Sequence, residues 1–298
     1  MDWTKRLVSK LRPAFGANPV PSLIGAQISA PAPNWQGYSP PLLHPDRNLV
    51  VSWSPKAGCT QTLIWFFHQI GVLEAALAHH AFPHNYRMEI YQLSSANRAR
   101  RNALMVSGGK GYTLLRMVRD PDKRLVSSFR HAVKHPLLDA LAQEKLGIDL
   151  REKGLSLRNL ARILEGEDIG GQGRIDKHLR PQQHPVWAMG FDRVITLNMD
   201  RSPLHEGLNA VEAGLDLPHT DFASLAGVLS HDTRRYAIEQ PYAGKVPLAK
   251  FRFRKNRDGS FPKAEFLALP LLQQLAQKHY GGDFAEVATA DSARLLFR

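Results

Sequence analysis

Cysteine is nearly absent from this sequence, since Cys59 is the only one among 298 residues. An internal disulfide is therefore excluded, and a reducing compartment is the expected environment. Long apolar runs are absent as well: the best candidate, Leu63–Leu77, is interrupted by His68, Gln69 and Glu74, which excludes a membrane span there. The start of the chain lacks the charged, apolar and small-residue regions of a signal peptide. We therefore expect a cytoplasmic protein.

Acidic residues are the minority charge, with 27 Asp and Glu against 39 Lys and Arg, so the formal net charge is +12. This balance favours an acidic partner such as nucleic acid, an anionic membrane surface or a small polyanion. A merely basic, solvated surface fits the charge equally well. No His, Cys or Asp cluster has the spacing of a metal site, so no metal is expected.

Residues 1–47 differ in composition from the rest. Trp3, Leu7, Val8 and Leu11 share one face of a helix whose other side is basic. Residues 1–15 could thus make peripheral contact with a membrane, or dock on their own domain. The prolines that follow predict an extended leader. We expect a leader over 1–47 and one domain over 48–298.

Strand-like and helix-like patterns alternate along residues 48–298. Apolar runs predict strands at 49–53, 112–118 and 191–197. Helical spacing predicts helices from residue 60, after residue 120, and at 137–145, 155–165, 204–213 and 263–280. This alternation indicates an α/β protein with a three-layer open parallel sheet flanked by helices.

The stretch NLVVSWSPKAGCTQ, residues 48–61, predicts an anion site. A buried strand is broken by Pro55 and Gly58 and leads into a helix. The N–H groups and positive dipole end of such a helix converge on one point. Lys56 adds a cation there, and Cys59 and Thr60, with Thr62 in the next turn, add small polar side chains.

The stretch lacks two common phosphate-binding motifs, those of the P-loop and of the cysteine phosphatases. Its lysine precedes Gly58, whereas a P-loop has G-K-[ST]. A cysteine phosphatase needs an arginine soon after its thiol, but position 65 is tryptophan. Cys59 could have a lowered pKa at the helix start, although a small loop-filling role is the more common one.

A second strand, residues 112–118, runs into Arg119, Asp120 and Pro121. Asp120 suits the N-cap position and Pro121 the first helical position. This strand, tight turn and helix repeat the order of the first site. Arg119 is at the carboxyl end of a strand, where open α/β sheets bind ligands, although an ion pair with Asp120 or Asp122 is the alternative.

These residues carry a family resemblance. SPKAGCTQTLIWFF resembles the 5′-phosphosulfate loop of sulfotransferases, and LLRMVRDPDKRLVSSFRHAV resembles their 3′-phosphate motif. IDKHLRPQ, FDRVITLNMD and LAQKHYGGDFAEV are similar to later segments of the carbohydrate sulfotransferases, the group that includes the chondroitin and dermatan 4-O enzymes. The motifs occur in the family's order and cover most of residues 48–290.

The resemblance implies a P-loop-NTPase-like sulfotransferase fold and the donor 3′-phosphoadenosine 5′-phosphosulfate (PAPS). Lys56 would contact the 5′-phosphate and the bridging oxygen. Arg119 and Ser127 would bind the 3′-phosphate. The 5′-phosphate would also be held by the remaining residues of the first site, namely the backbone of Ala57, Gly58, Cys59, Thr60 and Gln61 and the hydroxyls of Thr60 and Thr62.

Transfer to a hydroxyl also needs a general base. His178, with Asp176 nearby in sequence to orient it, is preferred, and His84 is the other candidate. Departures from the animal enzymes are the missing membrane anchor and the missing cysteine pair after Gln182, where the chain reads QHPVWAMGFD. They leave glycosaminoglycan specificity open.

We therefore expect a PAPS-dependent sulfotransferase that acts on a hydroxyl of a carbohydrate or glycoconjugate and has no nucleic-acid partner. One alternative is a nucleotide-dependent kinase with an atypical phosphate loop. Another is a basic nucleic-acid-binding protein, suggested by the pI near 9.9 and the segment FRFRKNR.

Overall fold

The computed structural model describes residues 38–170, 173–233, 241–254, 261–288 and 290, with the side chains of 230–233 left aside. Its centre is a four-stranded open sheet in the order β1-β2-β3-β4. The strands are β1 (Leu42–Leu43), β2 (Leu49–Trp53), β3 (Thr113–Val118) and β4 (Arg193–Asn198). β1 is antiparallel to β2, and the other three strands are parallel. The chain is thus an α/β protein with a mostly parallel sheet.

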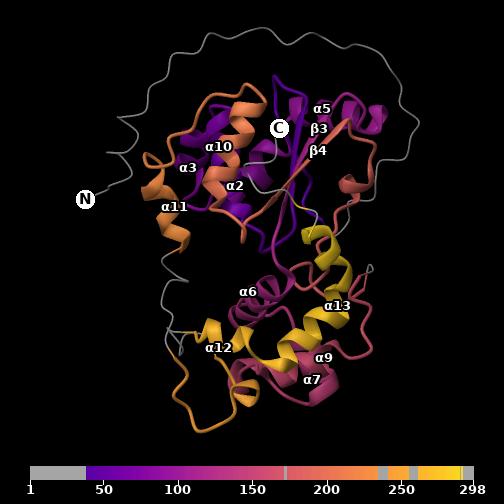
Figure 1. Cartoon of the computed structure of the whole chain (residues 1–298), viewed down its shortest axis with the longest axis vertical. Coiled ribbons are helices and arrows are strands. Elements are labelled where there is room, and N and C mark those ends of the chain that lie inside the picture. The colour runs from indigo at the N-terminus through magenta and orange to yellow at the C-terminus, as the bar shows by residue number, and fades with distance from the viewer. Residues whose placement is uncertain (1–37, 171–172, 234–240, 255–260, 289, 291–298) are drawn as a thin grey trace.

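Helices follow each parallel strand. Those around the sheet are α2 (Cys59–Gln69), α3 (Leu73–His79), α4 (Pro83–Tyr86), the π-helix η1 (Arg87–Tyr91), α5 (Ser95–Ser107), the 3₁₀ helix η2 (Pro185–Ala188), α10 (Leu204–Gly214) and α11 (Ala226–Thr233). The others are α6 (Pro121–Lys134), α7 (Asp139–Leu146), α8 (Leu150–Lys153), α9 (Leu157–Leu164), the 3₁₀ helix η4 (Leu248–Lys250), α12 (Lys263–Leu267) and α13 (Pro270–Ala288). Figure 1 shows α2, α3, α5 and α10 around the sheet and α6, α7, α9, α12 and α13 gathered below it.

Both faces of the sheet are covered by helices. Alternate side chains of a strand point to opposite sides, so one strand can contribute to a cluster on each face. Val51 and Trp53 of β2 pack in one cluster with apolar residues of α2 and α10. Val50 packs in another, with Leu104 of α5 and Val186 of η2. This burial on both sides explains why β2 reads as a continuous apolar run.

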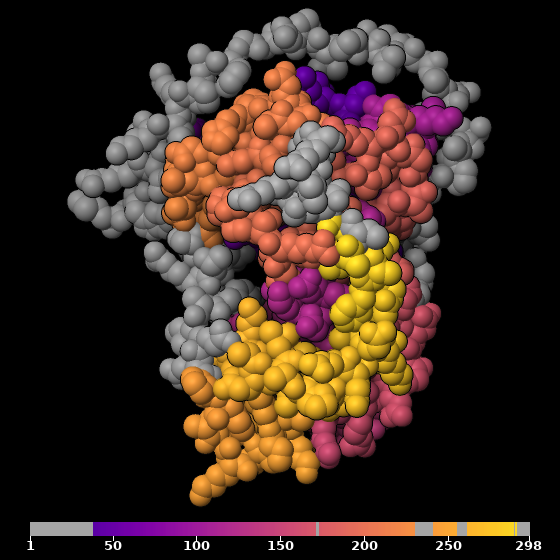
Figure 2. Space-filling model, in the orientation of Figure 1, coloured from indigo at the N-terminus to yellow at the C-terminus, as the bar shows by residue number. Residues whose placement is uncertain are grey.

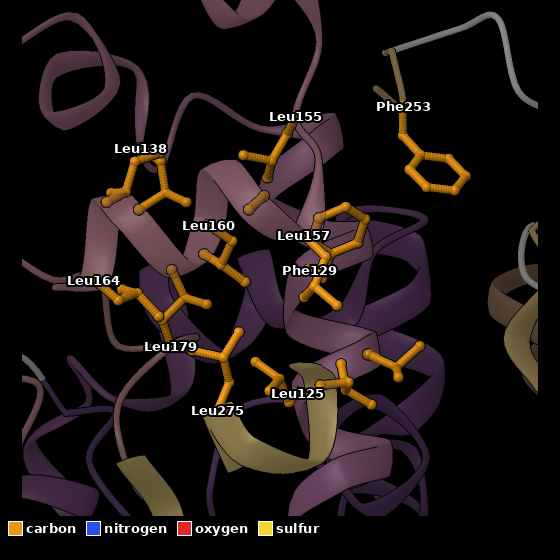
Figure 3. Close-up of a cluster of buried hydrophobic side chains, with 14 of the residues drawn as sticks. Leu125, Phe129, Leu138, Leu155, Leu157, Leu160, Leu164, Leu179, Phe253 and Leu275 are labelled. Atoms are coloured by element: carbon orange, nitrogen blue, oxygen red, sulfur yellow. The ribbon is translucent and has the colours of Figure 1, made fainter. Parts of the chain in front are cut away.

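The helices below the sheet form their own core around α6. Phe129 lies at its centre and contacts the rings of Phe253, Phe261 and Phe266. Leu157 and Leu160 of α9 pack into the same cluster (Figure 3). The apolar stripe of α6, which follows β3, therefore packs against helices that come later in the chain, among them α7 and α13.

One expectation about element boundaries is wrong. The predicted helix over 263–280 is two helices, α12 and α13, because Pro270 lacks the N–H that a continuous helix needs. Within the expected leader over 1–47, which stays a prediction, Leu42 and Leu43 form a short strand that pairs with Val51 and Val50. The amphipathic pattern of residues 1–15 lies outside the described residues, among which no helix has the length and apolarity to cross a membrane.

Candidate anion-binding site

The two predicted anion-binding turns lie side by side. Trp53, the last residue of β2, is the register partner of Met117 in β3. Met117 is in turn the partner of Leu197 in β4. The loops after these parallel strands therefore leave the same edge of the sheet, which is where open α/β sheets bind ligands. Figure 2 shows the surface hollowed below the orange α10–α11 region, with atoms of α6 exposed beneath it.

The loop after β2 holds Lys56 in an unusual conformation. The Ala57 N–H donates to the Ser54 carbonyl at 3.2 Å, which closes a four-residue turn. Lys56 has φ of 71° at the third position of this turn, where type II turns normally have glycine. A non-glycine residue there costs about 1–3 kcal/mol, and such strain clusters at functional sites. The fold thus maintains a strained lysine at this edge.

Helix α2 starts directly after this turn. Gly58 is its N-cap, with φ of 76°, no side-chain cap bond forms, and no acidic residue lies in the first turn. A Cβ on Gly58 would approach Leu204 Cδ2 to 2.9 Å, so both space and backbone conformation require glycine. Among the described residues, no side chain caps the positive end of the helix dipole, an arrangement that favours an anion.

The structure changes the roles expected for some residues of this loop. The N–H of Ala57 is used by the Ser54 turn, so it is not available to a ligand in this conformation. Thr62 is completely buried, and its Oγ1 has no hydrogen-bond partner among the described residues. Cys59, Thr60 and Gln61 are partly exposed. The accessible groups are therefore those of residues 58–61 and Lys56.

Arg119 connects the two turns. Its Nη1 donates to the Lys56 carbonyl at 3.3 Å, and its Nε lies 3.2 Å from Asp200 Oδ2. The expected alternative was an ion pair with Asp120 or Asp122, but the carboxylate that pairs with it comes from the loop after β4. Gln182 clamps the Arg119 backbone, accepting from its N–H at 2.8 Å and donating to its carbonyl at 2.7 Å.

Asp120 occupies the predicted N-cap position of α6, but its side chain makes no cap bond. It accepts instead from Asn198 Nδ2 at 2.9 Å and from Lys123 Nζ at 3.0 Å. Ser127, the predicted partner of Arg119, lies on α6 and is partly exposed. Ser128 is buried, and its hydroxyl donates to the His178 carbonyl at 2.5 Å. Helix α6 thereby holds the segment of the first candidate base.

His178 has the environment of an oriented imidazole. Its Nδ1 lies 2.6 Å from Asp176 Oδ1. Burial alone would raise the pKa of Asp176, but hydrogen bonds from the His178 ring and backbone lower it to about 2. The ring of His178 also lies 4.2 Å from that of His131. Burial, and next the charge of Lys56, lowers the pKa of His131 to about 3, so this histidine pair lies close to the Lys56 loop.

His84, the other candidate base, lies beside the start of α2. Its Nε2 is 3.4 Å from Thr60 Oγ1, and its ring meets the edge of Trp53. Burial, followed by the charges of Arg87 and Lys177, lowers the pKa of His84 to about 3. The ring is therefore neutral at pH 7. His178 thus lies near the Lys56 loop through His131, and His84 lies near it through Thr60 and Trp53.

A groove of 630 Å³ adjoins this edge and is lined by Gln61 of α2, Leu204 and Asn209 of α10, and Phe222. Its volume falls within the range of small-molecule sites. Among the residues that the structure describes, no group of His, Cys, Asp or Glu could hold a metal ion. Comparison with protein-family models, with curated proteins and with solved structures finds no match for this chain.

Several residues of the site were missed by reasoning from sequence. Asp200 follows β4 directly, and its place at the end of a strand is a signal that could have found it. Gln182 belongs to the recognised IDKHLRPQ segment but had no assigned role. Arg124 lies on the predicted α6 and Arg87 on η1, and nothing in their local sequence indicates that both are buried.

Proposed function

We propose that this protein is a sulfotransferase that uses PAPS to sulfate a hydroxyl of a carbohydrate or glycoconjugate, on a P-loop-NTPase-like fold. One observation carries the proposal: two strand–turn–helix units on adjacent parallel strands bring Lys56 and Arg119 together. The Arg119 Nη1 donates to the Lys56 carbonyl oxygen at 3.3 Å. A ligand with two separate anionic groups matches two such turns. PAPS has a 5′-phosphosulfate and a 3′-phosphate on one nucleotide.

The residues present fit that donor. The uncapped, acid-free start of α2 and the strained Lys56 suit the 5′ end, and Arg119 with Ser127 suits the 3′-phosphate. Asp200 restrains Arg119 without using all of its donors, because a guanidinium has five N–H groups. The lack of a G-K-[ST] sequence argues against the kinase alternative.

In the reaction, the acceptor oxygen forms a bond to sulfur while the bond from sulfur to the 5′-phosphate oxygen breaks. Adenosine 3′,5′-bisphosphate is released, and the hydroxyl proton passes to a base. Lys56 stabilises the charge that develops on the leaving oxygen. His178 accepts the proton at Nε2, since Asp176 holds its Nδ1–H. The remaining contribution of the chain is positioning.

Nucleotide binding tests the proposal. Adenosine 3′,5′-bisphosphate is expected to bind more tightly than 5′-AMP by about 10–150-fold, because charge-assisted hydrogen bonds are worth about 1.5–3 kcal/mol. Isothermal titration without Mg²⁺ measures both affinities. An Arg119→Lys variant should lose much of the difference, since lysine lacks the planar fork.

Equal affinity for the two nucleotides would refute the assigned 3′-phosphate site. Tighter binding of Mg²⁺–ATP would favour the kinase. Steeply salt-dependent binding to arbitrary DNA with no 3′-phosphate preference would favour a nucleic-acid-binding protein.

The two candidate bases can be separated by substitution. His178→Gln is expected to lower turnover by about 10²–10⁴-fold, the usual contribution of a general base. His84→Gln should have a much smaller effect, because His84 is buried and its Nε2 faces Thr60 at 3.4 Å. Release of adenosine 3′,5′-bisphosphate from PAPS with a panel of carbohydrates, followed by chromatography, measures turnover.

Affinity for adenosine 3′,5′-bisphosphate should remain unchanged in both variants, which shows that folding and nucleotide binding are intact. A larger loss of turnover in His84→Gln than in His178→Gln would make His84 the general base instead of His178. Asp176→Asn is expected to shift the pH dependence of turnover, because Asp176 orients the His178 ring.

A further inference from the structure

Arg87 is a buried cation with little to neutralise it. It is the first residue of the π-helix η1 and is only 5% exposed. Among the described residues, its Nε and Nη1 have no hydrogen-bond partner, and no carboxylate lies within 4 Å of its guanidinium. Buried arginines are normally paired, because burial of a charge without compensation is costly. The surroundings of Arg87 therefore suit an oxyanion.

The neighbours of Arg87 belong to the candidate site. Its guanidinium lies 5.5 Å from the ring centroid of Trp53, the last residue of β2. Burial lowers the pKa of Arg87, and Cys59 at the start of α2 is near enough to raise it. The charge of Arg87 in turn contributes to lowering the pKa of His84, whose Nε2 lies 3.4 Å from Thr60 Oγ1. Arg87 thus lies beside the N-terminus of α2.

The cation–π contact with Trp53 does not replace an anion. It offsets part of the charge, but the N–H groups lie in the guanidinium plane and still need acceptors. Neighbouring groups add positive charge rather than cancel it, since Lys177 also lowers the pKa of His84. An oxyanion would satisfy both the unpaired N–H groups and the local excess of positive charge.

The surface beside His84 includes Phe82. This side chain is 43% exposed, and its ring lies 4.8 Å from that of His84. Met88 and Ile90, on η1 itself, are also exposed.

We propose that Arg87, with Trp53 and Thr60, forms a second oxyanion site next to the Lys56 loop. Resting on the proposed function, this site takes an oxygen of the sulfuryl group of the donor or an acid group of the acceptor. Both are oxyanions, and the experiment distinguishes them. The Cys59 side chain is the competing partner of the Arg87 guanidinium.

The probe is inorganic sulfate, titrated into protein saturated with adenosine 3′,5′-bisphosphate at constant ionic strength. Sulfate is expected to bind the parent protein, and Arg87→Met should weaken it by at least about tenfold, the loss of one charge-assisted contact. Arg98→Met, which removes an exposed arginine of α5, is the matched control and should bind sulfate as the parent does.

Two further arms identify the source of the anion. If the site takes the sulfuryl group, Arg87→Met weakens PAPS but leaves adenosine 3′,5′-bisphosphate unchanged. If it takes an acid group of the acceptor, both nucleotides bind normally and glucuronate binding is lost. Unchanged binding of sulfate, glucuronate and PAPS in Arg87→Met would overturn the site and favour Cys59 as the partner of Arg87.

Thermal unfolding provides a readout independent of the nucleotide. Sulfate should raise the Tm of the ligand-free parent more than that of Arg87→Met. The ligand-free variant should be at least as stable as the parent, because an unpaired buried charge has been removed. If nucleotides fail to bind but this sulfate effect persists, the proposed function fails and the anion site stands. If Arg87→Met does not fold, Arg87→Lys is used, and an unchanged sulfate effect in it would contradict the role of the planar fork.

Discussion

Lys56→Ala is expected to reduce turnover by about 10²–10³-fold, the effect of removing one preorganised group that stabilises developing charge. The reason is its position: Lys56 lies directly before the uncapped start of α2, and its charge is near enough to lower the pKa of His131. Release of adenosine 3′,5′-bisphosphate from PAPS in the presence of carbohydrates measures the loss. Lys110→Ala, which removes an exposed lysine, is the control.

The strain at Lys56 allows a sharper test. Lys56→Gly relieves the φ of 71° and should stabilise the fold by about 1 kcal/mol, while turnover falls as in the alanine variant. Chemical denaturation measures the stability of each variant. A Lys56→Gly protein that is both stable and fully active would contradict the assigned role. Lower stability than the parent would show that the side chain holds the loop together.

Arg124→Ala is expected to destabilise the fold by about 3 kcal/mol. Arg124 is 0% exposed, donates from Nε to the Pro55 carbonyl at 3.0 Å and lies over the Tyr280 ring at 5.6 Å. It therefore ties α6 to the Lys56 loop and to α13. Alanine leaves a cavity, and the Pro55 carbonyl keeps only the 3.5 Å bond from the Ser54 hydroxyl. Equilibrium unfolding in urea measures the change.

A matched variant separates the contribution of packing from that of the hydrogen bond to Pro55. Arg124→Met fills most of the space but cannot donate to Pro55, so a loss of about 1–2 kcal/mol is expected. Arg158→Ala, an exposed arginine of α9, should change stability by less than about 0.5 kcal/mol. Both Arg124 variants should also weaken adenosine 3′,5′-bisphosphate, because the loop loses its anchor. Parent-like stability and affinity in both would refute this role.

The parts of the fold that depend on local chemistry were predictable. The strand over 49–53 and the α/β class are confirmed, because an apolar run between breakers and a change to helical spacing are visible in sequence. The start of α6 at Pro121 is confirmed for the same reason: proline suits the first helical position.

The short strand β1 was not predictable in the same way. Leu42 and Leu43 form a strand because they pair with β2, and their proline-rich surroundings read as an extended leader. The split between α12 and α13 at Pro270, in contrast, follows a local rule and could have been predicted.

Sequence alone determined where the candidate site lies: a lysine in a strand-to-helix turn, and an arginine at the end of the next parallel strand. Tertiary structure alone decided that the Arg119 guanidinium meets the Lys56 carbonyl and Asp200, and that Arg87 is buried beside Trp53. The reason is physical. Local propensities depend on neighbours within a few positions, whereas these contacts depend on the strand order β2-β3-β4 and its register, which only the packing of the whole chain sets.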